Sequence, residues 1–382
     1  MVPLASNSPN ALYPREAADA LRSGAVVLIP TDTVFGLAAD ASSPDALRAL
    51  WSISEDAAPL TPQPLAWHIG TAAPLLEALS AAESSLSPIQ KRLIDRLCPG
   101  PILLAIELPE PALATIRSHL GVEAGVIDDA QTLLVRITGH PDAQRFLEAA
   151  QRPVVVRALP GTGTPRTLDE AVRALERAGM ASSVAAALKS ESRPLGQPST
   201  LLRFLSSGGY GVDREGAYAA RYIDKQIMHT ILFVCTGNTC RSPMAEAIAR
   251  HLIEQLPLDL PTTVRSAGAF TSEGMPATPE AVVAVESLGV PMPHHASSVL
   301  TRELIAQADE IYGLTASHLE AIRSIDPSAS DKAKLLDPSG SDVPDPIGQG
   351  QSVYNTTAQR LRELIAQRLA EHRSASTKEH SR

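Results

Sequence analysis

Apolar residues in the second half of the chain switch between two spacings. A short apolar run at 230–234, TILFV, has the character of a buried strand. In the segment PMAEAIARHLIEQL that soon follows, Met244, Ile248 and Leu252 recur at the spacing of one helical face. Further strands are predicted at 262–268 and 308–314, and further helices at 277–289 and 352–372. Strands that alternate with helices predict a parallel sheet covered on both faces, which is a three-layer α/β/α domain.

The first half mixes the same two patterns less regularly. Its amphipathic stretches predict helices at 14–24, 43–53, 140–150 and 168–178, and its apolar runs predict strands at 25–30, 64–69 and 102–108. This half is therefore expected to be a mixed α/β domain.

The turn-rich segment GGYGVDREG at 208–216 separates the two patterns, and a new apolar run begins just after Met228. A chain of 382 residues is long enough for two domains. We expect one domain at 1–226 and a second at 227–374. The polar residues 375–382 are expected to form a flexible tail.

Charge and cysteine content narrow the class of protein. The net charge of -9 argues against binding nucleic acid through bulk electrostatics. No apolar run reaches the roughly 18 residues of a membrane span, and the N-terminus MVPLASNSPN lacks the regions of a signal peptide. The three cysteines cannot form a disulfide framework. We therefore expect a reduced, cytoplasmic enzyme that does not associate with membranes.

The stretch FVCTGNTCRSPMAE at 233–246 lies between the first predicted strand and helix of the second half. Cys235 and Arg241 stand six positions apart, and Ser242 and Pro243 are suited to the N-cap and first position of the helix. A helix N-terminus and an arginine both favour the nucleophilic thiolate. Backbone N–H groups of a tight turn bind anions, and a guanidinium binds two phosphoryl oxygens at once. The pattern predicts a phosphate-binding loop that forms a cysteinyl-phosphate intermediate.

The alternative interpretation of the two loop cysteines is a metal site or a buried structural pair. Zinc normally takes four ligands, and the sequence offers no second Cys/His pair at a suitable spacing. His294 and His295 are adjacent, which is awkward for chelation. We therefore expect no metal site.

The second half, over about residues 229–372, resembles the low-molecular-weight protein-tyrosine phosphatases, whose loop has the form C-x4-C-R-S-P. The resemblance implies that Cys235 is the nucleophile, that Arg241 binds the phosphoryl oxygens and that Ser242 hydrogen-bonds the thiolate. It also implies phosphorylated proteins as substrates and no cofactor for this half. The residues expected to form the phosphate-binding loop are Thr236, Gly237, Asn238, Thr239, Cys240 and Ser242.

The proposed chemistry also needs an acid for the leaving group and then a base for water, and one carboxylate can serve as both. The segment DVPDPIGQG offers Asp342 and Asp345, with Asp337 upstream. Asp345 fits the family's D-P motif best, so the resemblance implies that it is the general acid and base. Each aspartate taken alone would more often be a turn residue.

The choice of phosphorylated residue depends on Thr239. The tyrosine phosphatases of this family usually carry a bulky aliphatic residue there, whereas CTGNTCRSPMAE is similar to a branch that removes phosphate from arginine. Tyrosine-directed members also carry aromatic residues after the D-P motif, where this chain has Ile347 and Gly348. The arginine branch often has phenylalanine in place of Ile347, so the chain departs from that pattern too. We favour phosphoarginine, with phosphotyrosine as the alternative.

Two further residues of this half have open roles. Cys240 either forms a protective disulfide with Cys235 or is a small buried residue behind the loop. His295 is expected to form hydrogen bonds in a loop rather than to act in the chemistry.

The first half resembles the threonylcarbamoyl-AMP synthase (YrdC-like) family in four segments that occur in the family's order. They are VVLIPTDTVFGLAADA at 26–41, CPGPILLAI at 98–106, VRITGHPDAQRFLEAA at 135–150 and GQPSTLL at 196–202. Thr31, Asp32 and Thr33 of the first segment form a candidate ligand site. Arg136, Arg157 and Arg166 could line a residual anion site.

The family's cation pair for ATP phosphates is missing from this half. Glu55 and Asp56 occupy the matching stretch, and two carboxylates would repel a triphosphate. We expect a degenerate domain, which retains a site for a ligand, an RNA end or a protein, or simply stabilises the phosphatase. In the alternative, the chain is a bifunctional synthase that uses ATP, threonine and bicarbonate, and only then would ATP be required.

Overall fold

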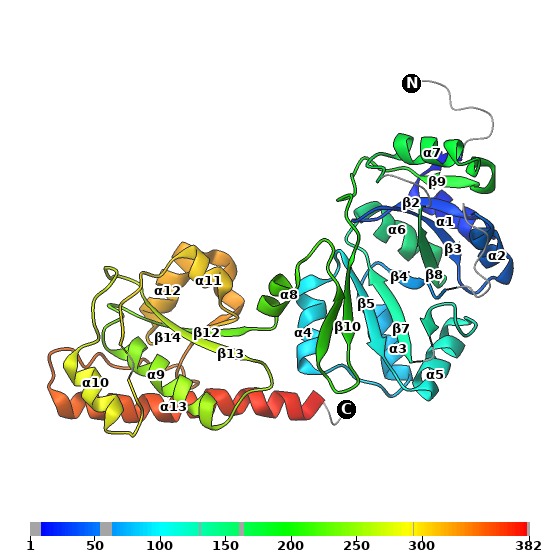
Figure 1. Ribbon diagram of the computed structural model, residues 1–382. Helices are drawn as coiled ribbons and strands as arrows, with labels where there is room; N and C mark the ends of the chain where they lie inside the picture. The colour runs from blue at the N-terminus through cyan, green and yellow to red at the C-terminus, as the bar shows by residue number, and fades with distance from the viewer. Residues whose placement is uncertain (1–8, 54–62, 130, 160–163, 293, 380–382) are drawn as a thin grey trace. The chain divides into compact units, whose positions relative to one another are not determined.

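The computed structural model describes residues 9–53, 63–129, 131–159, 164–292 and 294–379, with side chains described up to residue 372. The chain divides into two compact units, Met1–Gln226 and Ile227–Arg382 (Figure 1). Among the described residues, no helix combines the length and the apolar character that crossing a membrane requires.

The C-terminal unit is built on a four-stranded sheet in the order β13-β12-β14-β15. All three pairings in it are parallel, as the sequence predicted. The carboxyl ends of these strands therefore meet at one edge of the sheet, and Cys235 is the last residue of β12. The strands are β12 (His229–Cys235), β13 (Thr262–Gly268), β14 (Glu310–Gly313) and β15 (Ala333–Leu335).

Helices cover both faces of this sheet (Figure 1). Side chains alternate along β12 because successive residues of a strand point to opposite faces. Ile231 and Phe233 enter the core formed with α9 (Arg241–Gln255), α10 (Pro279–Glu286) and α13 (Gln351–Glu379). Leu232 and Val234 enter the core formed with α11 (Arg302–Gln307) and α12 (Ala316–Ile325). The result is the predicted three-layer α/β/α arrangement.

The structure differs from the sequence-based expectation at the end of the chain. The helix α13 spans Gln351–Glu379, so it extends beyond residue 374, where the flexible tail was expected to follow. Residues 375–379 contain neither proline nor glycine, so nothing in their backbone chemistry ends the helix. The elements α11, α12 and β15 of this unit were not predicted from the sequence.

The N-terminal unit contains a mixed sheet in the order β1-β9-β2-β3-β8-β4-β7-β5-β10-β11, with β6 paired to β7. Pairs such as β2·β3 are antiparallel and pairs such as β4·β7 are parallel, so the expected mixed α/β fold is confirmed. Its strands are β1 (Asn10–Leu12), β2 (Val27–Pro30), β3 (Phe35–Asp40), β4 (Ala66–Ile69), β5 (Ile102–Glu107), β6 (Asp128–Asp129), β7 (Thr132–Ile137), β8 (Val154–Ala158), β9 (Ala186–Leu188), β10 (Thr200–Phe204) and β11 (Tyr210–Arg214). Its helices are α1 (Pro14–Arg22), α2 (Pro44–Ser52), α3 (Ala73–Ala81), α4 (Pro88–Leu97), α5 (Glu110–Leu120), α6 (Pro141–Ala150), α7 (Leu168–Arg177) and α8 (Ala220–Gln226).

Candidate active site

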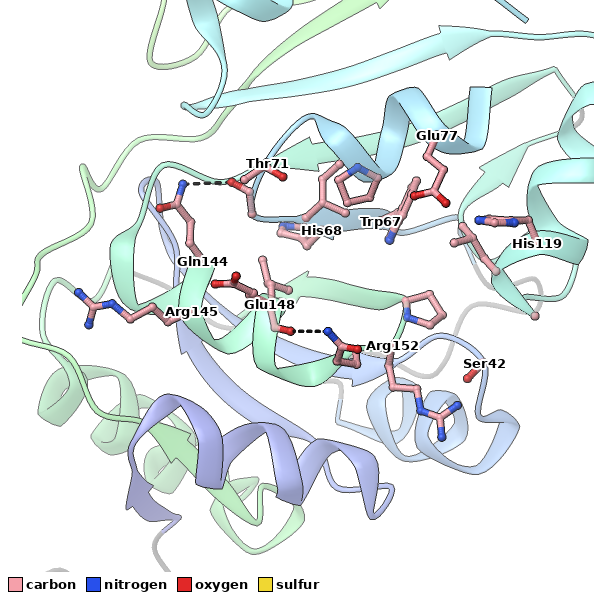
Figure 2. Close-up of a pocket in the computed structure, with 18 of the residues that line it drawn as sticks. Ser42, Trp67, His68, Thr71, Glu77, His119, Gln144, Arg145, Glu148 and Arg152 are labelled. Carbon is pink, nitrogen blue, oxygen red and sulfur yellow. Dashed lines mark hydrogen bonds between the residues drawn. The ribbon is translucent and has the colours of Figure 1, made fainter. Parts of the chain in front are cut away.

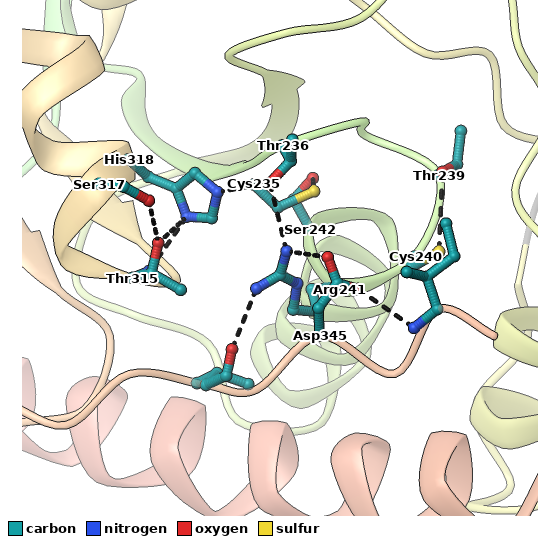
Figure 3. A network of polar contacts seen from close by, with 12 residues as sticks. Cys235, Thr236, Thr239, Cys240, Arg241, Ser242, Thr315, Ser317, His318 and Asp345 are labelled. Atoms are coloured by element: carbon teal, nitrogen blue, oxygen red, sulfur yellow. Dashed lines mark hydrogen bonds and ion pairs between the residues drawn. The ribbon is translucent and has the colours of Figure 1, made fainter. Parts of the chain in front are cut away.

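The loop that joins β12 to α9 surrounds the thiol of Cys235 (Figure 3). Ser242 Oγ lies 3.0 Å from Cys235 Sγ, and the backbone N–H of Asn238 donates to the same sulfur at 3.3 Å. Ser242 Oγ also accepts a hydrogen bond from Asn238 Nδ2 at 2.8 Å, so its own proton can point to the sulfur. Both groups are therefore placed to hold a thiolate.

The expectation that Ser242 caps the helix is wrong. The helix α9 begins at Arg241, Cys240 occupies the N-cap position, and no side chain makes the capping hydrogen bond. Ser242 lies in the first turn instead, where its hydroxyl contacts the sulfur of Cys235. The loop turns back toward the end of β12, so the hydroxyl of Ser242 faces the thiol of Cys235 and does not cap the helix.

Asn238 fixes the shape of this loop. Its φ of 52° lies in the left-handed region, which asparagine tolerates better than most residues. Its Nδ2 donates to Ser266 Oγ as well as to Ser242, and its Oδ1 accepts from the backbone N–H of Ser298. His295 Nε2 lies 2.7 Å from the carbonyl oxygen of Asn238, which confirms the expected role of His295 as a loop hydrogen-bonder.

Arg241 links the loop to the segment that carries the candidate acid. Its side chain is 4% exposed, and its two terminal nitrogens donate to Val343 O and to Asp345 Oδ2. One of them also donates to Thr236 Oγ1 at 3.3 Å. Among the described residues, Arg241 Nε has no hydrogen-bond partner although it is buried. A donor of this kind is suited to a phosphoryl oxygen.

The three aspartates named from the sequence lie in different surroundings. Asp345 contacts Arg241 at 2.5 Å, and its side chain is 40% exposed (Figure 3). Asp342 accepts a hydrogen bond from the first residue of α12, Ala316. Asp337 is buried and pairs with Arg360. Asp345 is thus the one of the three that contacts the arginine of the loop.

In the N-terminal unit, the candidate ligand residues gather around a buried arginine. Arg136 on β7 donates to Ser199 Oγ, to Asp32 Oδ1 and to Thr33 Oγ1. Thr31 and Thr33 contact each other through their hydroxyls at 3.1 Å. Among the described residues, Arg136 Nε and Asp32 Oδ2 are buried without a hydrogen-bond partner.

The other two arginines named for a residual anion site have different contacts. The guanidinium of Arg157 lies over the ring of Trp51 and donates to Ile53 O. The backbone N–H of Arg166 donates to Glu170. Arg136 is thus the arginine whose contacts with Asp32, Thr33 and Ser199 are seen. Glu55 and Asp56 lie outside the described residues.

Comparison with known proteins finds one family in each half of the chain. Residues 230–379 match the family described as low molecular weight phosphotyrosine protein phosphatase. Residues 19–216 match the Sua5/YciO/YrdC family, described as telomere recombination. The protein-arginine-phosphatase of Bacillus subtilis (strain 168) is 42% identical over 141 residues, which are 36% of this chain and 92% of that protein. The chain belongs to both families.

Other relatives of the phosphatase unit, Ile227–Arg382, carry two kinds of name. The protein-arginine-phosphatase of Geobacillus stearothermophilus is 38% identical over 147 residues, with 37% of this chain and 95% of that protein covered. The low molecular weight protein-tyrosine-phosphatase Ptp of Acinetobacter johnsonii is 33% identical over 137 residues, with 36% and 92% covered. Both predicted resemblances and the phosphatase class of the enzyme are confirmed. The names of these relatives point to two kinds of substrate, phosphoarginine and phosphotyrosine.

Thr239 and Cys240 form the end of the phosphatase loop. The side chain of Thr239 is half-buried, and its hydroxyl lies 3.6 Å from the sulfur of Cys240. Cys240 is buried, and its sulfur lies 3.3 Å from the hydroxyl of Tyr354 on α13. Burial and this contact with Cys240 raise the pKa of Tyr354 to about 12. Both loop cysteines are free thiols in this structure, and Cys240 packs behind the loop.

His318 on α12, which no pattern in the sequence indicated, supports the loop (Figure 3). Its Nδ1 accepts a hydrogen bond from the backbone N–H of Thr315, so Nε2 carries the proton and donates to Thr236 Oγ1 at 3.0 Å. Burial, and then the charge of Arg241, lower the pKa of His318 to about 4. The ring is therefore neutral near pH 7. It hydrogen-bonds the hydroxyl of Thr236, which also accepts a hydrogen bond from Arg241.

The YrdC-type unit, Met1–Gln226, contains a pocket of about 1070 Å³ next to β4, α3, α5 and α6 (Figure 2). None of Thr31, Asp32 and Thr33 lines it. Its lining includes His68, whose pKa is lowered to about 3 by burial and by the charge of Arg136. The labelled lining residues are Ser42, Trp67, His68, Thr71, Glu77, His119, Gln144, Arg145, Glu148 and Arg152.

Replacing His318 tests its support of the loop. We expect His318→Phe to lower kcat/KM by about 5-fold, because it removes a hydrogen bond worth about 1 kcal/mol next to Arg241. Steady-state kinetics at pH 7 with a small phosphate ester would measure this effect. His251→Phe, which changes a histidine facing Gln255 on α9, is the matched control. Equal rates in His318→Phe and wild type would contradict the role.

The pH dependence of stability gives a second test of His318. The unfolded chain binds a proton to this histidine near pH 6.5, whereas the folded chain resists until about pH 4. The stabilisation is therefore complete above pH 6.5 and is lost as the pH falls toward 4, by roughly 3 kcal/mol. Calorimetry of the phosphatase unit within the full chain should show a smaller loss between pH 7 and 4.5 in His318→Phe. The idea fails if both proteins lose the same stability.

Proposed function

We propose that the phosphatase unit removes phosphate from phosphoarginine in proteins through a cysteinyl-phosphate intermediate. The observation that carries the choice of substrate is Thr239, a half-buried hydroxyl in the loop that holds the nucleophile. A phosphoguanidinium is planar and polar, and a hydroxyl in the pocket wall can hydrogen-bond it. The two relatives named protein-arginine-phosphatase, at 42% and 38% identity, support this choice.

In the first step, Cys235 Sγ attacks phosphorus as the bond to the leaving nitrogen breaks. Arg241 Nε and the backbone N–H groups of the loop bind the phosphoryl oxygens, where negative charge is concentrated in the transition state. Asp345, in its protonated form, gives its proton to the leaving guanidine nitrogen. A phosphoryl group bound by Arg241 replaces the carboxylate of Asp345 as the partner of the guanidinium, which lets Asp345 face the leaving group.

In the second step, Asp345 acts as a carboxylate and takes a proton from water. The water oxygen attacks phosphorus, the bond from phosphorus to sulfur breaks, and inorganic phosphate leaves. The hydroxyl of Ser242 and the N–H of Asn238 hold the returning thiolate of Cys235. The electron pair of the broken bond stays on sulfur, so the enzyme returns to its starting state.

Phosphotyrosine is the second candidate, and one observation favours it. The side chain of Phe270 is 73% exposed, and its backbone N–H donates to the carbonyl oxygen of Thr236 in the loop. An exposed ring next to the loop can stack on a substrate phenyl group. Sequence comparison of the D-P segment alone missed this aromatic residue, because it lies in the loop that follows β13.

The YrdC-type unit is proposed to lack synthase activity while it retains a ligand site. Arg136 donates hydrogen bonds to Asp32 and Thr33 of the first segment. Its side chain is buried and already paired with Asp32. An arginine neutralised in this way attracts a triphosphate less than a free one. The buried atoms without partners, Arg136 Nε and Asp32 Oδ2, support a smaller polar ligand at this place. An active synthase remains the alternative.

The mechanism is tested by removing the thiol of Cys235. We expect Cys235→Ser to lower turnover of phosphoarginine and phosphotyrosine substrates by at least about 1000-fold, because the hydroxyl is a much weaker nucleophile than a thiolate. Release of inorganic phosphate measures the rate. Cys98→Ser, a change in the other unit, should keep the wild-type rate. Full activity in Cys235→Ser would disprove the covalent route.

The substrate is tested by a change at Thr239. We expect Thr239→Ile to lower the ratio of kcat/KM for phosphoarginine to that for phosphotyrosine by about 10-fold or more, because the hydroxyl is lost and the wall becomes apolar. Thr239→Ser keeps the hydroxyl and should retain most of the ratio. An unchanged ratio in Thr239→Ile would remove the argument for phosphoarginine.

The YrdC-type unit is tested by calorimetric titration of the full chain with ATP and magnesium in the presence of threonine. We expect no saturable binding at concentrations up to about 1 mM, since Arg136 is already paired. Binding with a Kd below about 100 µM that disappears in Arg136→Ala would favour the active synthase.

A further inference from the structure

A second polar cluster lies in the phosphatase unit, at the edge of the sheet opposite to Cys235. His229 is the first residue of β12 and Glu310 is the first residue of β14, so both stand where these parallel strands begin. His372, near the end of the described part of α13, reaches the same place. One ligand atom from each of the three residues lies within 4.8 Å of the other two.

The spacing within this cluster suits a metal ion. His229 Nε2 lies 3.3 Å from Glu310 Oε1, and His372 Nε2 lies 3.1 Å from Glu310 Oε2. Neighbouring ligands of a tetrahedral zinc ion, with bonds of about 2.0 to 2.1 Å, are roughly 3.3 to 3.4 Å apart. The two imidazole rings are 5.7 Å apart between centroids and inclined by 69°. The two histidines contact different oxygens of Glu310, so the three side chains have to move closer together to share one ion.

The surroundings orient the ligand atoms as supporting groups do in metal sites. The other ring nitrogen of His229, Nδ1, lies 3.8 Å from Asp309 Oδ2, which also accepts from the backbone N–H of Thr230. At this distance the negative charge of Asp309 favours the proton on Nδ1 of His229, which leaves the lone pair of Nε2 to the metal ion. The hydroxyl of Tyr312 donates to Glu310 Oε2 at 2.7 Å. Ligating carboxylates are commonly held by such a hydrogen bond.

In the part of the chain that the structure describes, one of the ligand nitrogens of the cluster lacks a hydrogen-bond partner. Among the described residues, His229 Nε2 is buried and has no partner with hydrogen-bond geometry. A nitrogen so placed needs either a proton, as in an ion pair, or a metal ion.

We propose that His229, Glu310 and His372 bind a divalent transition-metal ion, Zn²⁺ in the first place. Two imidazole nitrogens and one carboxylate oxygen form a typical three-residue zinc set, which leaves one position for water. The ion joins the amino ends of β12 and β14 to the last part of α13, so its role is to fasten that helix to the sheet. This site is separate from the phosphatase loop and does not depend on the substrate proposed above.

The test is zinc binding to the full chain after removal of metals with a chelator. Cys235→Ser and Cys240→Ser are present in every sample, so that loop thiols cannot bind the ion. Competition with a chromophoric zinc chelator should show one Zn²⁺ per chain. We expect His372→Gln and Glu310→Gln to weaken binding by at least about 100-fold and Asp309→Asn by about 10-fold or more. His251→Gln, on α9, is the matched control and should bind as the parent does.

Two further measurements distinguish a metal site from an ion pair. Co²⁺ should give the visible absorption of a tetrahedral site in the parent protein and not in His372→Gln, and circular dichroism verifies that each variant is folded. Zn²⁺ should raise the melting temperature of the parent by several degrees at about 100 times its Kd. The proposal is overturned if the parent binds no Zn²⁺ with a Kd below about 100 µM. It is equally overturned if His372→Gln and Glu310→Gln bind as tightly as the parent.

Discussion

The phosphatase site depends on the hydrogen bonds of one side chain amide, that of Asn238. A loop that points its N–H groups inward to an anion leaves few backbone partners to hold it in that shape. Asn238 supplies the missing bonds, because its Nδ2 reaches Ser242 and Ser266 and its Oδ1 reaches the backbone of Ser298. Ser266 in turn donates to Glu246 on α9. The sheet, the helix and the loop are therefore joined behind the thiol of Cys235.

This hydrogen-bond network is buried, and it orients the side chains of Ser242 and Cys235. Ser242 takes its orientation from the Asn238 amide, and the sulfur of Cys235 takes its partner from Ser242. Thr236 is held from the opposite side by His318, which lies on the other helical layer. Both layers of the domain thus contribute to one loop, and preorganisation of this kind is what electrostatic catalysis requires.

The sequence contained the parts of the site that are close together along the chain. Cys235, Arg241 and the helix after them lie within one strand, loop and helix, so their spacing alone predicted the phosphate loop. Asp345 was found only through the resemblance, since 104 residues separate it from Arg241.

Residues that come together from distant parts of the chain could be found only from the structure. His318 and the cluster of His229, Glu310 and His372 carry no local pattern, because their contacts join different strands and helices. The propensity of Ser242 for the N-cap position misplaced it as a cap, whereas the resemblance had already implied the contact of its hydroxyl with the thiol. The three residues of the proposed metal site lie on three separate elements, so a search of the sequence for neighbouring Cys/His pairs did not find them.

The contact between Arg241 and Asp345 has a consequence for product inhibition. Any anion that binds Arg241 has to compete with a carboxylate that is covalently part of the protein and therefore always present at high effective concentration. Inorganic phosphate and a phosphorylated side chain both bear this cost. Each offers Asp345 a hydrogen-bonding group in return, which is a hydroxyl of the phosphate or the leaving group of the substrate. In the proposed mechanism the internal ion pair thus weakens the binding of both anions and helps the loop to empty between turnovers.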